Sequence, residues 1–173
     1  MQKVVAIAPN PSRAESKGPV KVYDSLYLGS RLDARNVRKL KALGITAVVD
    51  CAPEYKTIDA KQTKQEKQCF AESFAKQCLK LDLHDDERVL TEFRAHAEKA
   101  IDFINKHCDK NKKVLVYCHL GTSRAAGIVL AYMMRKQDID YSVALGHLRN
   151  LCAGTDQVIL PNMWIEDLLA MWE

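Results

Sequence analysis

Residues 113–134 read KVLVYCHLGTSRAAGIVLAYMM and divide into an apolar stretch, a short polar loop and a second apolar stretch. Residues 113–117 form a short apolar run, which favours a buried β-strand. Residues 125–134 are apolar on every side of a helical projection, which predicts a helix buried in the middle of the domain. The stretch therefore predicts a strand–loop–helix unit at the centre of the fold.

Strand and helix patterns alternate on both sides of this unit. Strands are predicted in residues 20–28, 45–50 and 78–83, and helices are predicted from an N-cap at Asp33 to Leu43, over 91–107, from an N-cap at Asp140 to Leu151, and from Pro161 through Trp172. Such alternation predicts an α/β fold, a sheet covered by helices on both faces. With 173 residues the chain suits one domain, which we place at residues 20–173 after a flexible arm at 1–19.

The loop of residues 118–124 has the composition of a phosphate-binding site. A strand–loop–helix turn directs backbone N–H groups inward near the positive end of the helix, and a phosphate dianion fits such a nest. Gly121 allows the tight turn, and the planar guanidinium of Arg124 can hold two phosphate oxygens. At the floor of the nest the thiol of Cys118 would ionise readily and attack phosphorus, forming a phosphocysteine intermediate. The residues expected to bind the substrate phosphate are His119, Leu120, Gly121, Thr122 and Ser123, although His119 could equally be an exposed loop residue without a role.

Phosphate monoesters hydrolyse very slowly in water, so the leaving oxygen needs a proton from a nearby acid. The acidic loop after Leu83 supplies two carboxyl groups, those of Asp85 and Asp86. This loop follows a predicted strand, and sites in α/β sheets gather outside the carboxyl ends of strands. We therefore expect the acid on this loop.

Composition argues against several other classes of function. The net charge of +4 is too small and too scattered to indicate nucleic acid binding, and no apolar run approaches the roughly 20 residues of a membrane span. The cysteines form no Cys-x-x-Cys pair and have no histidine at zinc spacing, so we expect neither a metal nor a cofactor. We expect a monomer in the cytoplasm, with the nucleus as a second location, whose partner is a phosphorylated protein substrate.

The loop resembles that of the dual-specificity phosphatases, a branch of the cysteine-based protein tyrosine phosphatases, which reads His-Cys-x-x-Gly-x-Ser-Arg-Ser/Thr. Further segments similar to the family are residues 27–30, 44–49, 81–85, 100–104 and 161–162, so the resemblance covers roughly residues 20–172. It implies a mixed, mainly parallel sheet of about five strands flanked by helices. It also implies hydrolysis of phosphotyrosine, and of phosphoserine and phosphothreonine, with Cys118 as nucleophile and Arg124 as phosphate clamp. The general acid is then Asp85, with Asp86 as the alternative.

Two positions depart from the family pattern. Tyr117 stands where the family has a His that orients the loop, and Ala125 stands where a Ser or Thr hydroxyl helps the cysteine leave. Losing a hydrogen bond to a charged group costs about 1.5–3 kcal/mol, roughly one to two decades of rate. Ser123 is a candidate to replace part of the missing hydroxyl. Some members of the class protect the nucleophile in a reversible disulfide, a role open to Cys51, whose alternative is a packed core thiol.

Four functions remain in competition at this point. The first is a protein phosphatase, and the second is a low-activity or pseudophosphatase module that binds phosphorylated proteins, which Tyr117 and Ala125 favour. The third is a phosphatase for lipid, glycan or RNA phosphates. The loop argues against it, because no Lys or Arg lies between Cys118 and Arg124 to bind a polyanionic head group. A sulfurtransferase is a remote fourth, because its loop usually has a shorter spacing from Cys to Arg.

Overall fold

The computed structural model describes residues 17–51, 77–108, 110, 112–155 and 157–172. The predicted N-terminal arm lies almost wholly outside the described residues. The polar stretch 53–76, for which no sequence pattern predicts a shape, lies outside them as well.

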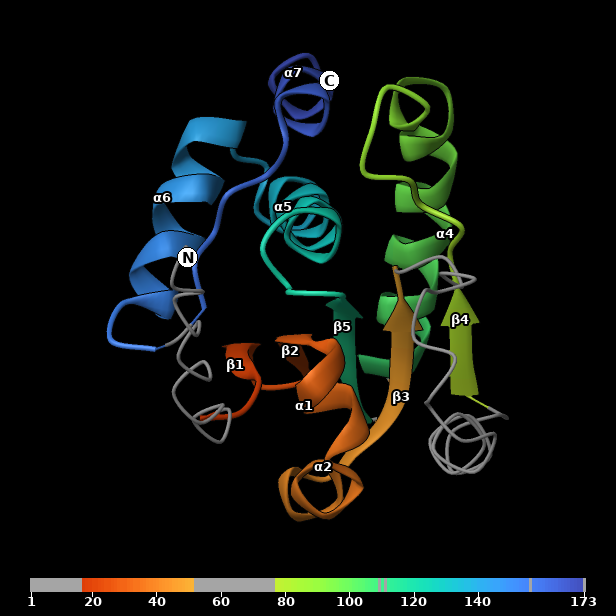
Figure 1. Cartoon of the computed structure of the whole chain (residues 1–173), viewed down its shortest axis with the longest axis vertical. Coiled ribbons are helices and arrows are strands. Elements are labelled where there is room, and N and C mark those ends of the chain that lie inside the picture. Colours follow the sequence, from red (N-terminus) through yellow and green to blue (C-terminus); the bar gives the residue numbers. More distant parts are fainter. Residues whose placement is uncertain (1–16, 52–76, 109, 111, 156, 173) are drawn as a thin grey trace, which may run out of the picture.

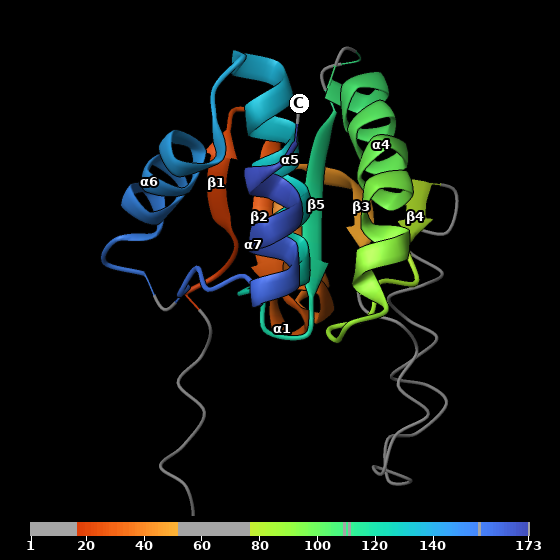
Figure 2. The same cartoon turned by 90° about the horizontal axis from the view of Figure 1, so that it is seen from above.

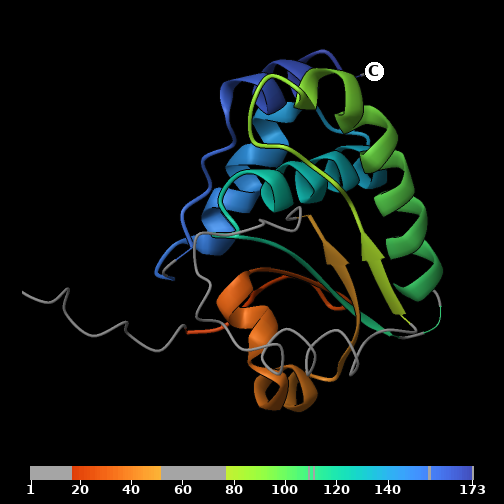
Figure 3. The same cartoon turned by 45° about the vertical axis from the view of Figure 1, so that its right-hand side comes forward.

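A five-stranded sheet forms the centre of the described structure, in the order β1-β2-β5-β3-β4. β1 (Val20–Tyr23) and β2 (Leu26–Ser30) pair antiparallel, whereas β2, β5 (Lys113–Cys118), β3 (Ile45–Asp50) and β4 (Cys78–Lys80) run parallel. Figure 3 shows β3 and β4 side by side and pointing the same way. The expected mixed, mainly parallel sheet is confirmed, and the strand of the central sequence unit, β5, is its middle strand.

Helices cover both faces of this sheet, as expected (Figure 1). They are α1 (Arg31–Arg35), α2 (Val37–Leu43), α4 (Val89–Cys108), α5 (Arg124–Gln137), α6 (Tyr141–Cys152) and α7 (Met163–Ala170). α1 and α2 pack on one face through a small core that includes Leu40 and Tyr117. The other four cover the opposite face, where the larger core lies. In Figure 2, α5 and α7 lie over the central strands, with α6 toward the β1 end of the sheet and α4 toward the β4 end.

The helix predicted to be buried is the most enclosed helix of the described structure. Every residue of α5 from Arg124 to Met134 is buried, so the all-apolar pattern is confirmed. Since β5 leads directly into the loop and the loop into α5, the central unit is fixed at both ends by core packing.

The structure corrects four of the predicted element boundaries. Asp33 is not an N-cap: Ser30 caps α1, and the Asp33 carboxylate accepts from the Ser30 N–H at 2.8 Å, a reciprocal capping box that places Asp33 in the first turn. The predicted single helix then divides at Asn36, which caps α2. The strand predicted over 78–83 ends at Lys80, because its partner β3 ends at Asp50. Pro161 precedes the last helix, whose N-cap is Asn162.

No helix in the described part of the chain is long and apolar enough to cross a membrane. Within the same residues, no three His, Cys, Asp or Glu side chains lie together in a way that could hold a metal ion.

Candidate active site

The loop of residues 118–124 joins the carboxyl end of β5 to the first turn of α5, and its carbonyl groups are tied to the surrounding chain. The His119 oxygen accepts from Arg31 N at 3.2 Å, that of Leu120 from Gln157 Nε2 at 3.2 Å, and that of Thr122 from Leu160 N at 3.0 Å. In a planar trans peptide unit the next N–H points the opposite way. The N–H groups of Leu120, Gly121 and Ser123 therefore point away from these anchors, toward the inside of the loop.

One of these inward N–H groups has its acceptor in the structure. Gly121 N donates to Cys118 Sγ at 3.2 Å, and Cys118 is buried at the end of β5. A backbone donor thus already lies against the sulfur of Cys118. Gly121 has a φ of +79°, and a Cβ on it would lie 2.6 Å from the carbonyl oxygen of Gly29 in β2. The predicted need for glycine thus has two causes, the left-handed backbone and the approach of a neighbouring strand.

Arg124 ends the loop and begins α5, and the residue is only 4% exposed. Its Nη1 donates to the carbonyl oxygen of Leu83 at 3.3 Å, which ties it to the acidic loop after β4. Its Nε is 3.8 Å from Asp85 Oδ2, too far for a hydrogen bond, and has no hydrogen-bond partner among the described residues. Arg124 is therefore a buried cation beside Asp85 whose Nε still has a hydrogen bond to donate.

The side chain at the start of α5 does not cap the helix. Ser123 occupies the N-cap position but makes no side-chain capping bond. Its hydroxyl instead donates to Asp85 Oδ1 at 3.0 Å and accepts from Asn162 N at 3.0 Å. The Ser123 hydroxyl is therefore engaged with Asp85 and Asn162, and the first turn of α5 offers the kind of backbone N–H groups that bind anions.

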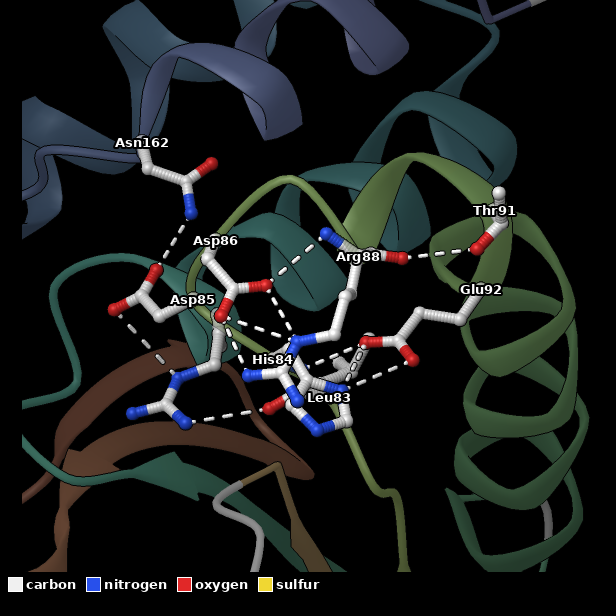
Figure 4. Close-up of polar contacts among 9 residues, drawn as sticks. Leu83, His84, Asp85, Asp86, Arg88, Thr91, Glu92 and Asn162 are labelled. Carbon is white, nitrogen blue, oxygen red and sulfur yellow. Dashed lines mark hydrogen bonds and ion pairs between the residues drawn. The ribbon is translucent and has the colours of Figure 1, made fainter.

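The two candidate acids lie in different surroundings (Figure 4). Asp86 pairs with Arg88 through three side-chain hydrogen bonds of 2.5–3.1 Å. Those bonds, above all, hold the pKa of Asp86 at about 2, so it stays ionised near neutral pH. Asp85 instead lies against Ser123 and Arg124, and its side chain is 39% exposed. Of the two carboxyl groups, the structure brings only that of Asp85 to the loop.

The two departures from the family pattern are both buried. Tyr117 packs in the small core beneath α1 and α2, on the face of β5 opposite Cys118. Burial, the charge of Asp50 and a hydrogen bond with Asp50 raise the pKa of Tyr117 far above its usual range, so the phenol stays neutral. Ala125 lies in the first turn of α5 and offers only a methyl group.

Cys51 follows β3 and is fully buried in the same core as Cys118. Its N–H donates to the carbonyl oxygen of Tyr117 at 2.8 Å, beside the start of the loop. Burial first, and then the proximity of Cys118, raise the pKa of the Cys51 thiol well above its usual range. The described structure is thus that of a packed neutral thiol near Cys118, and a disulfide between the two cysteines stays a prediction.

Exposed apolar side chains flank the loop on the α7 side. Leu120, Val158, Leu160 and Met163 are between 63% and 65% exposed. The hydrogen bonds from Gln157 and Leu160 bring the segment before α7 against the loop, and along it buried Ile159 and Pro161 alternate with exposed Val158 and Leu160. We call Leu120, Val158, Leu160 and Met163 the apolar rim. Sequence reasoning missed the rim as well as the contacts of Gln157 and Asn162, although residues 161–162 carry part of the resemblance.

Comparisons with known proteins show the family to which the chain belongs. A family model described as the dual specificity phosphatase catalytic domain matches residues 26–173. The chain is 31% identical over 118 residues to human protein phosphatase Slingshot homolog 1, which covers 68% of this chain and 10% of that protein. It is 30% identical over 139 residues to dual specificity protein phosphatase PHS1 of Arabidopsis thaliana, a match that covers 80% of this chain and 14% of that protein. The chain therefore spans only a small part of the length of these relatives.

Solved structures resemble it over a larger share of both chains. The human tyrosine phosphatase-like serine/threonine/tyrosine-interacting protein superposes with a TM-score of 0.67 at 25% identity, covering 88% of this chain and 93% of that one. A tyrosine-to-histidine variant of human DUSP28 gives a TM-score of 0.67 at 23% identity, covering 88% of this chain and 91% of that one. This likeness supports the fold. Since the family's catalytic-domain model spans nearly the whole described fold, the chain belongs to the dual specificity phosphatases of the cysteine-based protein tyrosine phosphatase superfamily.

Proposed function

We propose that this protein removes phosphate from phosphorylated proteins, with phosphotyrosine as substrate and phosphoserine and phosphothreonine as further substrates. Family membership supports the class of reaction. The observation that carries the site is the buried Nε of Arg124, which has no hydrogen-bond partner among the described residues. Such a donor costs about 1–3 kcal/mol when unpaired, and a phosphate oxygen is an acceptor of the right charge to remove that cost.

In the proposed first step, the Cys118 thiolate attacks phosphorus and the bond from phosphorus to the leaving oxygen breaks. The inward N–H groups and Arg124 hold the equatorial phosphate oxygens, where negative charge is stabilised. The leaving oxygen takes its proton from the Asp85 carboxyl, so the alcohol or phenol departs neutral. Phosphate is left on sulfur as phosphocysteine.

In the second step, a water molecule attacks phosphorus and gives a proton to the Asp85 carboxylate. The bond from phosphorus to sulfur breaks, Cys118 leaves as thiolate, and inorganic phosphate is released. Asp85 and Cys118 are then in their starting forms. The N–H of Gly121, which points at the sulfur, supports the departing thiolate where the chain has Ala125 in place of a hydroxyl.

The surroundings of the loop favour a polypeptide substrate over a polyphosphorylated head group. A polyanion needs several cationic side chains, and Arg124 is the one Lys or Arg within residues 118–124. The apolar rim instead offers side chains suited to the residues that flank a phosphorylated position.

Hydrolysis of a small aryl phosphate by the wild type, Cys118→Ser and Asp85→Asn tests this proposal. We expect activity in the wild type that is lost in Cys118→Ser, with a trapped phosphocysteine detectable by mass spectrometry after rapid acid quench. Asp85→Asn should lower kcat/KM for phosphotyrosine peptides by about 100-fold, the low end of general acid catalysis. Chelator should change nothing. Activity that survives Cys118→Ser would exclude the mechanism.

The second candidate is a module that binds phosphorylated proteins without releasing phosphate efficiently. Two observations favour it: the neutral buried Tyr117, and the methyl group of Ala125 where the family has a hydroxyl. A solved relative at 25% identity carries the name of an interacting protein. Phosphopeptide binding by a wild type that is as inactive as Cys118→Ser would select this candidate over the enzyme.

A further inference from the structure

Asn162 joins three parts of the site, and Figure 4 shows its side chain directed at Asp85. Its Nδ2 donates to Asp85 Oδ1 at 2.6 Å, and its Oδ1 accepts from Ile165 N at 2.9 Å, which caps α7. Its backbone N–H donates to Ser123 Oγ at 3.0 Å. A single residue therefore ties the first turn of α7 to the phosphate loop and to the proposed acid.

Two donors converge on one oxygen of the Asp85 carboxyl group. Asn162 Nδ2 and Ser123 Oγ both donate to Oδ1, while Oδ2 lies 3.8 Å from Arg124 Nε. A carboxyl group held at one oxygen keeps a fixed orientation, and the proton to be transferred is left to the other oxygen. Oδ1 of Asp85 is thus held by two hydrogen bonds, whereas Oδ2 faces Arg124.

The remaining charges near Asp85 are engaged elsewhere. Asp86 is paired with Arg88, and His84 Nδ1 lies 3.1 Å from the Glu92 carboxylate. These pairs fasten the acidic loop to itself and to α4. Among the residues that the structure describes, the Asp85 side chain is held by hydrogen bonds from Ser123 and Asn162, besides its ion pair with Arg124.

We propose that Asn162 is a positioning residue for the general acid. It holds Oδ1 of Asp85 so that Oδ2 delivers its proton to the leaving oxygen. Asn162 is itself held by the cap of α7 and by its place between buried Pro161 and the helix. This inference rests on the proposed phosphatase reaction, in which Asp85 is the acid.

The competing explanation is that Asn162 merely caps a helix, and the variant Asn162→Ser separates the two roles. Serine is as good an N-cap as asparagine, but it has no amide to donate to Asp85. Asn36 provides a matched control, since it caps α2 on the other face of the sheet by accepting from Lys39 N at 3.0 Å. Asn36→Ser makes the same exchange away from the loop, and thermal unfolding of both variants reports what the caps alone contribute.

The readout is the dependence of kcat/KM on the leaving group. Phenyl phosphate needs a proton on its leaving oxygen, whereas 4-nitrophenyl phosphate needs one much less, because its nitro group stabilises the phenolate. A misplaced acid should lower kcat/KM for phenyl phosphate by about tenfold, the low end for a lost charged hydrogen bond, since Ser123 still holds Asp85. The loss on 4-nitrophenyl phosphate should be several-fold smaller. Asn36→Ser should change neither.

A double-mutant cycle completes the test. If Asn162 acts through Asp85, then adding Asn162→Ser to Asp85→Asn should cause no further loss on phenyl phosphate. Equal losses on both substrates, no loss at all, or losses that simply multiply in the double variant would overturn the positioning role while leaving the phosphatase intact. A wild type without activity, or an Asp85→Asn variant as active as wild type, would remove the proposed reaction and this inference with it.

Discussion

Replacing Gly121 by alanine adds one methyl group, but it should displace the phosphate-binding loop and lower activity strongly. The added Cβ would lie 2.6 Å from the Gly29 carbonyl oxygen, whereas ordinary contact begins at 3.4 Å, so the loop and β2 must separate by about 0.8 Å. Gly29 is held in register with Tyr117 of β5, so the loop is the part that moves. The left-handed backbone adds about 1–2 kcal/mol of strain. A displacement near 1 Å at a reacting centre costs about 100-fold in rate, which is the expected loss of kcat/KM on 4-nitrophenyl phosphate.

The chain contains a matched control for this substitution. Gly154 has a φ of +78°, nearly that of Gly121, but a Cβ there would meet nothing within 4 Å. Gly154→Ala should therefore lose a similar 1–2 kcal/mol of unfolding free energy in urea, about the cost of the backbone strain alone, and keep its activity. Inhibition by orthovanadate should weaken only in Gly121→Ala. If the two variants have the same kcat/KM, the reasoning from the close approach to β2 is refuted.

Three further perturbations test other parts of the structure. Tyr117→His combined with Ala125→Ser should raise kcat on aryl phosphates by about one to two decades per position, measured at steady state, where the departure of Cys118 contributes to the rate. Gly146→Ala, at an exposed position within α6 where a Cβ meets nothing within 4 Å, should raise the unfolding free energy by about 1 kcal/mol in urea. Leu160→Ser in the apolar rim should raise KM for phosphopeptides with apolar flanking residues but not for 4-nitrophenyl phosphate, whereas Val143→Ser, an exposed apolar residue of α6, should change neither.

The central unit was predictable because its signal is local and continuous. An apolar strand, a loop with cysteine, glycine and arginine, and a helix apolar on all sides follow one another without interruption. Helix starts were harder, because a cap depends on which of several polar residues reaches the first turn. Ser30 and Asp33 are both plausible caps by composition, and only the reciprocal bond between them shows which one begins α1.

The site was predictable to the extent that it is local in sequence. Cys118 and Arg124 lie on one loop, and Asp85 could be placed beside them by the rule for strand ends and by family resemblance. Asn162 could not be assigned a contact in this way, because it is 77 positions from Asp85 and no periodic pattern links the two. The outward bonds of the loop carbonyls likewise come from distant segments, and distance along the chain hides them from any local pattern.

The enclosure of α5 gives the loop a long-range reporter. Amides such as those of Ile128 and Ala131, deep in a helix buried on all sides, should exchange hydrogen with solvent only when the whole domain opens. An anion that binds only the folded loop reduces the open population by mass action, so orthovanadate at 100 times its Kd should slow exchange at these amides about 100-fold. Occupancy of the site could therefore be read from hydrogen exchange in the interior of the helix, at residues beyond those of the loop.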